Sequence, residues 1–182
     1  MPRIAYQPAD LAVPADLVDT IRKRRGGELL NLDRMLLHSP AFARGWNGFL
    51  GEVRTALALP PKLRELAMCV VAVINGASYE FIHHAPEFVK AGGSDRQVAA
   101  LQTEDLEHLG ELVAEERLFD AAELATIALS FEMTAHVQVS DETFASVRAV
   151  LPDEQQVVEL IGVIATYNMV SRFLIALGVE PE

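Results

Sequence analysis

Apolar residues recur along this chain at the three- and four-residue spacing of amphipathic α-helices, in one segment after another. No stretch alternates apolar and polar residues with the β-branched enrichment that is typical of a strand. The spacing predicts helices over residues 16–25, 29–37, 40–57, 61–75, 79–91, a short stretch after 94, 124–135, 140–150 and 153–177. The pattern therefore predicts an all-α protein with short connections.

Local signals mark where several of these helices begin and end. Ser39-Pro40 is an N-cap followed by proline at the first helical position. Ser94 and Gln97 have the spacing of a capping box, as do Asp120 and Glu123 further along the chain. Gly92-Gly93 follows the end of the predicted helix 79–91, where a glycine commonly ends a helix.

The N-terminal segment differs from the rest of the chain. Residues 1–15 contain three prolines, which stop helices and remove backbone donors, so they predict an extended arm. Such an arm can drape over a neighbouring subunit or fray as a free terminus. Residues 16–182 are predicted to form one helical domain, a size that can bury a sizeable core.

Two predicted helices are apolar on almost every side, Leu63–Ile74 and Val157–Leu177. A helix without a polar face must be buried all round, and a single small domain rarely surrounds a helix completely. We therefore expect self-association as a dimer, trimer or hexamer, with a subunit interface covering part of these helices.

The same two segments resemble each other weakly, as the two copies of an internal repeat would. Glu65, an apolar run and Asn75-Gly76 correspond to Glu159, a second apolar run and Tyr167-Asn168. A duplicated helix-pair core would explain this correspondence, and so would chance.

Charge and cysteine content exclude several classes of function. The 182 residues carry a net charge of −11 and an isoelectric point near 4.9, which disfavours nucleic-acid binding. Cys69 is the one cysteine, so no disulfide can form within the chain. The longest apolar run, 66–74, falls short of the roughly 20 residues of a membrane span, and the N-terminus lacks a signal core. These features predict a cytoplasmic protein without a membrane anchor.

The predicted helix 79–91 carries the residues that are best suited to catalysis. Its apolar stripe is predicted to contain Phe81, Ile82, Ala85, Phe88 and Val89. His84 lies at the edge of this stripe and Glu80 lies one turn earlier, whereas His83 faces solvent. Glu65 sits near the start of an otherwise apolar helix, where a carboxylate needs a partner. A carboxylate paired with an imidazole in an apolar site can relay protons.

Each of these residues also has an ordinary structural interpretation. Glu65 could simply complement the helix dipole, and the two histidines could be surface or core residues. Glu80 and His83 spell Glu-x-x-His, a ligand pair of carboxylate-bridged metal sites. Such sites need a second copy, which the sequence lacks. We therefore predict no metal and no cofactor.

The stretch from Leu63-Arg64-Glu65-Leu66 through Asn75-Gly76-Ala77-Ser78-Tyr79-Glu80-Phe81-Ile82-His83-His84 to Ala91-Gly92-Gly93-Ser94 resembles the core of the carboxymuconolactone decarboxylase family, which includes the AhpD-like alkylhydroperoxidases. The resemblance extends over roughly residues 20–178. It implies an AhpD-like helical bundle. In the peroxidase branch the glutamate corresponds to Glu65 and the histidine to His84, whereas the two cysteines correspond to Ala77 and Glu80.

The resemblance therefore implies acid–base chemistry without sulfur. Peroxide reduction by the family route needs a nucleophilic thiolate and a resolving thiol, which alanine and glutamate cannot supply. Cys69 is expected to be buried and inert. We therefore expect peroxidase or peroxiredoxin activity in other members of the family and not in this chain.

The decarboxylase branch keeps the glutamate and histidine and acts on a small lactone that bears carboxylates. The resemblance implies that His84 is the acid–base group and that Glu65 orients it. Glu80 is expected to adjust the electrostatic environment of His84. The residues predicted to line a substrate pocket are Tyr79, Trp46 and His38, with Arg172 or the cluster Arg22–Arg25 holding a substrate carboxylate. Two alternatives remain open: another acid–base reaction, such as hydration or isomerisation, and a non-catalytic oligomeric binding protein.

Overall fold

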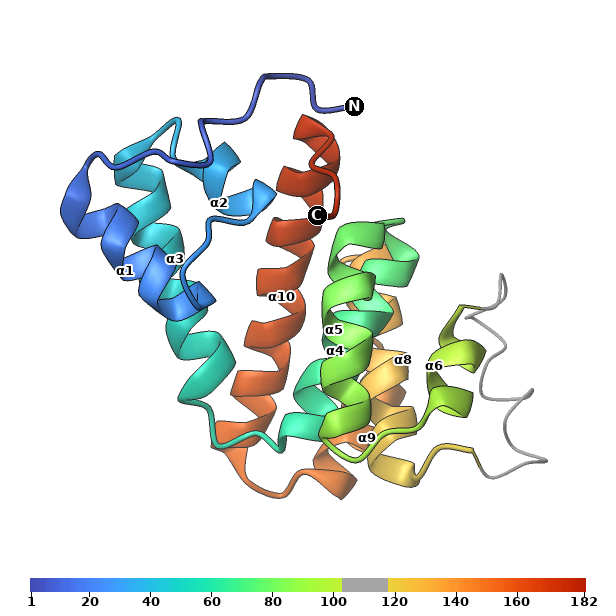
Figure 1. Cartoon of the computed structure of the whole chain (residues 1–182). Coiled ribbons are helices and arrows are strands. Elements are labelled where there is room, and N and C mark those ends of the chain that lie inside the picture. Colours follow the sequence, from blue (N-terminus) through green and yellow to red (C-terminus); the bar gives the residue numbers. More distant parts are fainter. Residues whose placement is uncertain (103–117) are drawn as a thin grey trace. The chain divides into compact units, whose positions relative to one another are not determined.

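The computed structural model describes residues 1–102 and 118–182, which form helices joined by short connections and contain no strand (Figure 1). The helices are α1 (Ala15–Arg25), α2 (Asn31–Leu36), α3 (Pro40–Thr55), α4 (Pro61–Ile74), α5 (Ser78–Lys90), α6 (Asp95–Leu101), α8 (Ala121–Ala135), α9 (Asp141–Val150) and α10 (Glu154–Leu177). The all-helical prediction is confirmed, and the predicted boundaries agree with these to within a few residues.

Two of the three N-terminal capping signals form the predicted hydrogen bonds, whereas Ser39 stands at the N-cap of α3 without a side-chain capping bond. At the start of α6, the backbone N–H of Gln97 donates to Ser94 Oγ at 3.2 Å, and the Ser94 N–H donates to Gln97 Oε1 at 2.9 Å. Asp120 and Glu123 form the same reciprocal pair at the start of α8. These bonds satisfy backbone donors that have no partner within the helix, which fixes where each helix begins.

The described residues divide into two compact units. The N-terminal unit contains Met1–Ala56 and Phe173–Glu182, and the core unit contains Leu57–Arg172. Helix α10 belongs mostly to the core unit, and its last turn belongs to the N-terminal unit.

In the N-terminal unit, the arm is held by the unit's own residues. The Arg3 N–H donates to the Leu177 carbonyl at 2.8 Å, and the Glu180 N–H donates to the Tyr6 hydroxyl at 2.9 Å. From α2, the Arg34 Nε donates to the Gln7 carbonyl at 2.6 Å. The extended arm that the prolines predict is thus anchored within one chain.

The arginine cluster that ends α1 fixes the same unit. Arg24 and Arg25 both donate to the buried carboxylate of Asp33, Arg25 Nε at 2.9 Å. Arg22 donates to the carbonyl oxygens of Ala9 at 2.7 Å and Gly27 at 3.1 Å. These guanidinium groups hold the arm and α2 in place, which gives the cluster a structural role.

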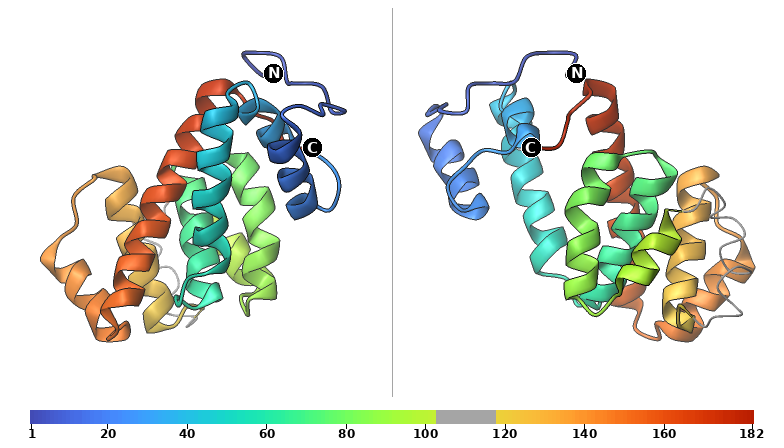
Figure 2. Two further views of the ribbon diagram at one scale, coloured as in Figure 1. Left: turned by 90° about the vertical axis from the view of Figure 1, so that its left-hand side faces the viewer. Right: turned by 45° about the vertical axis from the view of Figure 1, so that its right-hand side comes forward.

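In the core unit, α4 is the central helix, and α5 and α8 pack beside it (Figures 1 and 2). One face of α4, including Leu66, Cys69 and Val70, joins a hydrophobic core with Phe88, Leu101, Phe119 and Ile127. Every residue from 66 to 72 is buried within the single chain. The burial of α4 therefore needs no subunit interface, which removes one of the two reasons for expecting self-association.

Helix α10 is the described helix whose length and composition would suit a membrane crossing. That is a weak indication, because a core helix of a soluble protein passes the same test. Leu160, Val163, Ile164 and Tyr167 of α10 are fully buried inside the protein.

Candidate active site

Glu65 of α4 and His84 of α5 meet across the two helices, with Glu65 Oε2 2.7 Å from His84 Nδ1. The turn around Asn75 and Gly76, where Gly76 has a φ of 67°, reverses the chain between them. Glu65 lies ten residues before Asn75 and His84 lies nine after it. Because two helices joined by a tight turn run antiparallel, residues at equal distance from the turn face each other.

Arg64 completes this pair. Its Nε and Nη2 both lie 3.2 Å from Glu65 Oε1, so the carboxylate is held by a guanidinium on one oxygen and an imidazole on the other. Burial of Glu65 acts to raise its pKa, but the hydrogen bond and charge of His84, with Arg64, outweigh burial and lower it. Glu65 is therefore ionised at neutral pH and accepts both bonds.

An ionised partner fixes the tautomer of the imidazole. Because the Glu65 carboxylate can only accept, the Nδ1 of His84 carries a proton. Nε2 is then the nitrogen that does not face Glu65. The His84 side chain retains 13% of its exposed surface, so the ring is reachable at its edge.

Helix α10 lines the other side of α5 with two residues one turn apart. The ring of Tyr167 stands edge-on to the imidazole of His84, with 4.9 Å between centroids. The hydroxyl of Ser171 donates to Oε2 of Glu80, and both side chains are buried. Glu80, predicted at a polar–apolar boundary, is therefore a core residue in contact with α10.

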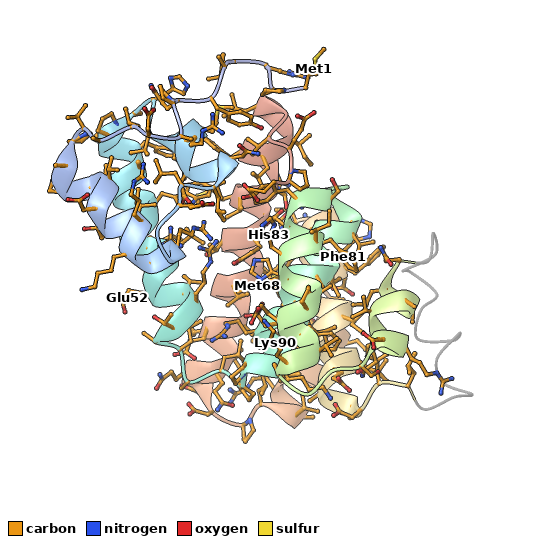
Figure 3. The ribbon with its side chains drawn as sticks, in the orientation of Figure 1. Met1, Glu52, Met68, Phe81, His83 and Lys90 are labelled. Atoms are coloured by element: carbon orange, nitrogen blue, oxygen red, sulfur yellow. The ribbon has the colours of Figure 1, made fainter. Side chains whose placement is uncertain are left out.

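Three helices thus each contribute two residues, four positions apart, to one group of side chains, which we call the three-helix cluster. Figure 3 draws the side chains of these helices and labels Met68 of α4 and His83 of α5 as guides. The cluster consists of Glu65 and Cys69 from α4, Glu80 and His84 from α5, and Tyr167 and Ser171 from α10. Arg64, Tyr167 and Ser171 were not among the site residues predicted from the sequence. The sequence offered one signal for Tyr167 and Ser171: they are four residues apart, as are Glu80 and His84.

Cys69 is a buried thiol. Burial raises its pKa well above the usual range, and the negative charges of Glu65 and Glu80 raise it further. A thiol that stays protonated is a poor nucleophile. The expectation that Cys69 is buried is confirmed.

Tyr79 packs against His83. The two rings stack with 4.4 Å between centroids, and His83 Nδ1 lies 2.7 Å from the Tyr79 carbonyl. His83 is therefore partly buried, whereas the sequence pattern placed it in solvent. The pattern failed because it oriented α5 by its apolar stripe alone. In the structure Ile82, from that stripe, is 55% exposed, since α10 contacts the side of the helix that carries Glu80.

The other predicted pocket residues have partners of their own. Arg172 donates to Asn168 Oδ1 at 2.6 Å, one turn earlier on α10. In the N-terminal unit, Trp46 packs on Phe173 with 5.1 Å between ring centroids, and His38 Nε2 lies 2.7 Å from the Ala5 carbonyl. A substrate-binding role for Tyr79, Trp46, His38 and Arg172 stays a prediction.

A cavity of about 370 Å³ lies in the core unit, and its lining does not include Glu65, Glu80 or His84. It is lined by Ala72, Val73, Gly76, Ser78, Phe81, Ile82 and Gln102.

Within residues 1–102 and 118–182, no three His, Cys, Asp or Glu side chains are grouped as metal ligands. The carboxylate–imidazole pair of the three-helix cluster has the geometry for proton transfer.

Comparison with known proteins found a family model that matches part of this chain. Residues 40–123 match the model of the carboxymuconolactone decarboxylase family. This segment includes Arg64, Glu65, Glu80 and His84. A search of curated proteins by sequence found no match.

Solved structures share the fold over most of the chain. A peroxidase-related protein from Silicibacter sp. TM1040 superposes with a TM-score of 0.80 at 14% identity, covering 100% of this chain and 92% of that chain. The debrominase Bmp8, as a cysteine-to-alanine variant in complex with 2,3,4-tribromopyrrole, gives 0.79 at 17% identity, covering 100% and 94%. A protein of Agrobacterium tumefaciens described as a candidate antioxidant defence protein AhpD gives 0.69 at 17% identity, covering 81% and 95%.

At such low identities these structures establish the fold alone. Their bundle architecture agrees with the all-helical AhpD-like fold that the sequence predicts. Together these findings show a chain with the AhpD-like fold, in which residues 40–123 match the carboxymuconolactone decarboxylase family model.

Proposed function

We propose that this protein is an acid–base enzyme of the carboxymuconolactone decarboxylase type, which acts on a small carboxylated lactone without thiol chemistry. The observation that carries the proposal is the 2.7 Å contact between Glu65 and His84, supported by Arg64. It joins a fixed carboxylate to an imidazole that is partly exposed, the arrangement needed to deliver a proton from a defined nitrogen.

In the proposed reaction, the bond between the lactone ring and its carboxylate carbon breaks and carbon dioxide leaves. The electron pair of that bond moves into the conjugated lactone. Protonated His84 then gives the proton on Nε2 to the electron-rich carbon and regains one from water. The ionised Glu65 stabilises the imidazolium before this transfer and keeps the ring oriented after it.

Two further features support this reaction over peroxide reduction. The positions that correspond to the peroxidase cysteines are Ala77 and Glu80, and the raised pKa of Cys69 keeps its sulfur protonated. Among the structural relatives, Bmp8 binds a small five-membered ring, tribromopyrrole, so the fold accommodates a ligand of lactone size.

The test is carbon dioxide release from 4-carboxymuconolactone, measured for the wild type, His84→Ala and His83→Ala. His83 is the matched control, because it is the neighbouring imidazole and contacts Tyr79 instead of Glu65. We expect wild-type turnover, a loss of at least about 100-fold in His84→Ala, and near-normal rates in His83→Ala. Full activity in His84→Ala, or no turnover by the wild type, would contradict the proposal.

We also propose that the protein self-associates. Helix α10 exposes Val158 and Met169, together with Gly162 and Ala165 on the same side of the helix. An apolar side with small residues lets a second helix approach closely. Light scattering coupled to size exclusion should give a multiple of the 19.9 kDa chain mass, and a monomer at micromolar concentration would refute this expectation.

A further inference from the structure

Glu80 is the site residue in which this chain departs most sharply from the peroxidase pattern. It corresponds to the second cysteine of that branch, yet it carries a carboxyl group and is only 2% exposed. A buried carboxylate needs groups that stabilise it. The structure supplies the hydroxyl of Ser171, which is fully buried on α10 and donates to Oε2 of Glu80.

We propose that Ser171 is a positioning residue, which holds the Glu80 carboxylate beside His84 and so sets the pH at which His84 gains and loses its proton. This inference rests on the proposed acid–base role of His84. It concerns a different contact from the one with Glu65, and it assigns a role to a residue outside the family-matched segment 40–123.

The geometry explains how one hydroxyl can have this effect. Glu80 and His84 lie one turn apart on α5, a spacing that puts their Cβ atoms about 5–6 Å apart on the same face. A glutamate side chain at that spacing can point toward the imidazole or along the helix. The hydrogen bond from Ser171 selects one orientation, because α10 is packed against this side of α5 through both Ser171 and Tyr167.

The groups around Glu80 come from all three helices. Their charges determine whether the protonation midpoint of His84 rises or falls. Helix α4 contributes the Glu65 carboxylate and the Cys69 thiol, whose pKa is raised by both carboxylates. Helix α5 contributes His84, and α10 contributes the hydroxyl of Ser171 and the ring of Tyr167, which stands edge-on to His84. A carboxylate held near His84 favours the imidazolium, so it moves the protonation midpoint of His84 to higher pH.

The experiment is an NMR titration of the histidine ring signals in the full-length protein, with the His84 signal assigned by its loss in His84→Ala. The variants are Glu80→Gln, Ser171→Ala and Ser171→Thr. We expect the His84 midpoint to fall by about one pH unit in Glu80→Gln and by about half of that in Ser171→Ala. Ser171→Thr keeps a hydroxyl and should restore the wild-type midpoint, whereas a role of Ser171 in packing alone predicts no midpoint change in Ser171→Ala or Ser171→Thr.

A double variant keeps the inference testable if threonine does not fit at position 171. In a Glu80→Gln background, Ser171→Ala should have no further effect on the His84 midpoint, because the group that Ser171 positions has lost its charge. An unchanged midpoint in Ser171→Ala, or equal shifts with and without Glu80, would overturn the proposal. Loss of turnover in His84→Ala is measured separately, so the acid–base proposal can stand while this one fails.

Discussion

Replacing Glu65 by glutamine changes one charge at the centre of the proposed site and almost nothing of its shape. Glutamine keeps one oxygen that can accept, but its amide NH₂ faces a donor, either the His84 Nδ1–H or the Arg64 guanidinium. At least one of the two bonds is therefore lost, and the buried donor that made it is left unsatisfied.

The magnitude follows from the burial of the three groups. Hydrogen bonds to charged groups contribute about 1.5–3 kcal/mol, and breaking a buried ion pair costs about 3–5 kcal/mol. The side chains of Glu65, His84 and Arg64 retain 9%, 13% and 14% exposure, so solvent relieves part of the cost. We expect Glu65→Gln to lower the free energy of unfolding by about 2–4 kcal/mol near neutral pH.

The pH dependence supplies the sharper test. The pKa of Glu65 is lowered on folding from its ordinary value of 4.5. A depressed carboxyl pKa contributes stability that is fully present above the unfolded value and is lost as the pH falls through the folded one. The difference between wild type and Glu65→Gln should therefore be largest above about pH 5 and shrink as the pH falls below 4.5.

The assay is guanidinium unfolding of both proteins across this pH range. Glu87→Gln serves as a control, since Glu87 is an exposed glutamate of α5 whose ion pair with Lys90 lies at the surface. It should change the unfolding free energy by less than about 0.5 kcal/mol. A cost for Glu65→Gln that is equally small, or one that does not decline toward acid pH, would refute the reasoning.

Three further outcomes follow from the described structure. Cys69 should resist iodoacetamide in the native protein and react fully in guanidinium, because burial raises its pKa; rapid native labelling would contradict this. Gly93→Ala should cost about 1–3 kcal/mol, because an added Cβ would lie 2.5 Å from the Phe88 ring, whereas Gly48→Ala on the exposed side of α3 should stabilise by about 0.5–1 kcal/mol; similar thermal shifts would refute the contrast. Asp33→Ala should destabilise the N-terminal unit by about 3–5 kcal/mol in chemical unfolding, because it leaves two arginines without their buried carboxylate, and a neutral effect would count against that role.

The sequence was sufficient for the helices because their periodicity is local and several of their boundaries have a local cause. Ser94 and Gln97 form the capping box that their spacing predicts, and Gly92, with a φ of 106°, ends α5 where the pattern placed the stop. The contact of Glu65 with His84 was likewise predictable, because both flank one short turn in a family pattern.

The remaining contacts depend on how distant helices pack, which periodicity within one helix does not contain. Ile82 looked like a core residue and Glu80 a boundary residue, yet α10 covers the side with Glu80 and leaves Ile82 exposed. The site roles of Tyr167 and Ser171 needed the same information. His38 and Trp46 looked like pocket residues by type, and their contacts are with the arm and with an aromatic group of their own unit.

The central claim is that an ionised Glu65 holds the proton of His84 on Nδ1 and leaves Nε2 as the exchanging nitrogen. The most direct measurement is the ¹⁵N NMR spectrum of the imidazole at a pH above the midpoint of the His84 titration, where the ring is neutral. We predict that His84 is the Nδ1–H tautomer in the wild type and loses this preference in Glu65→Ala, which removes the acceptor. A wild-type spectrum with the proton on Nε2, or one that Glu65→Ala leaves unchanged, would contradict this assignment.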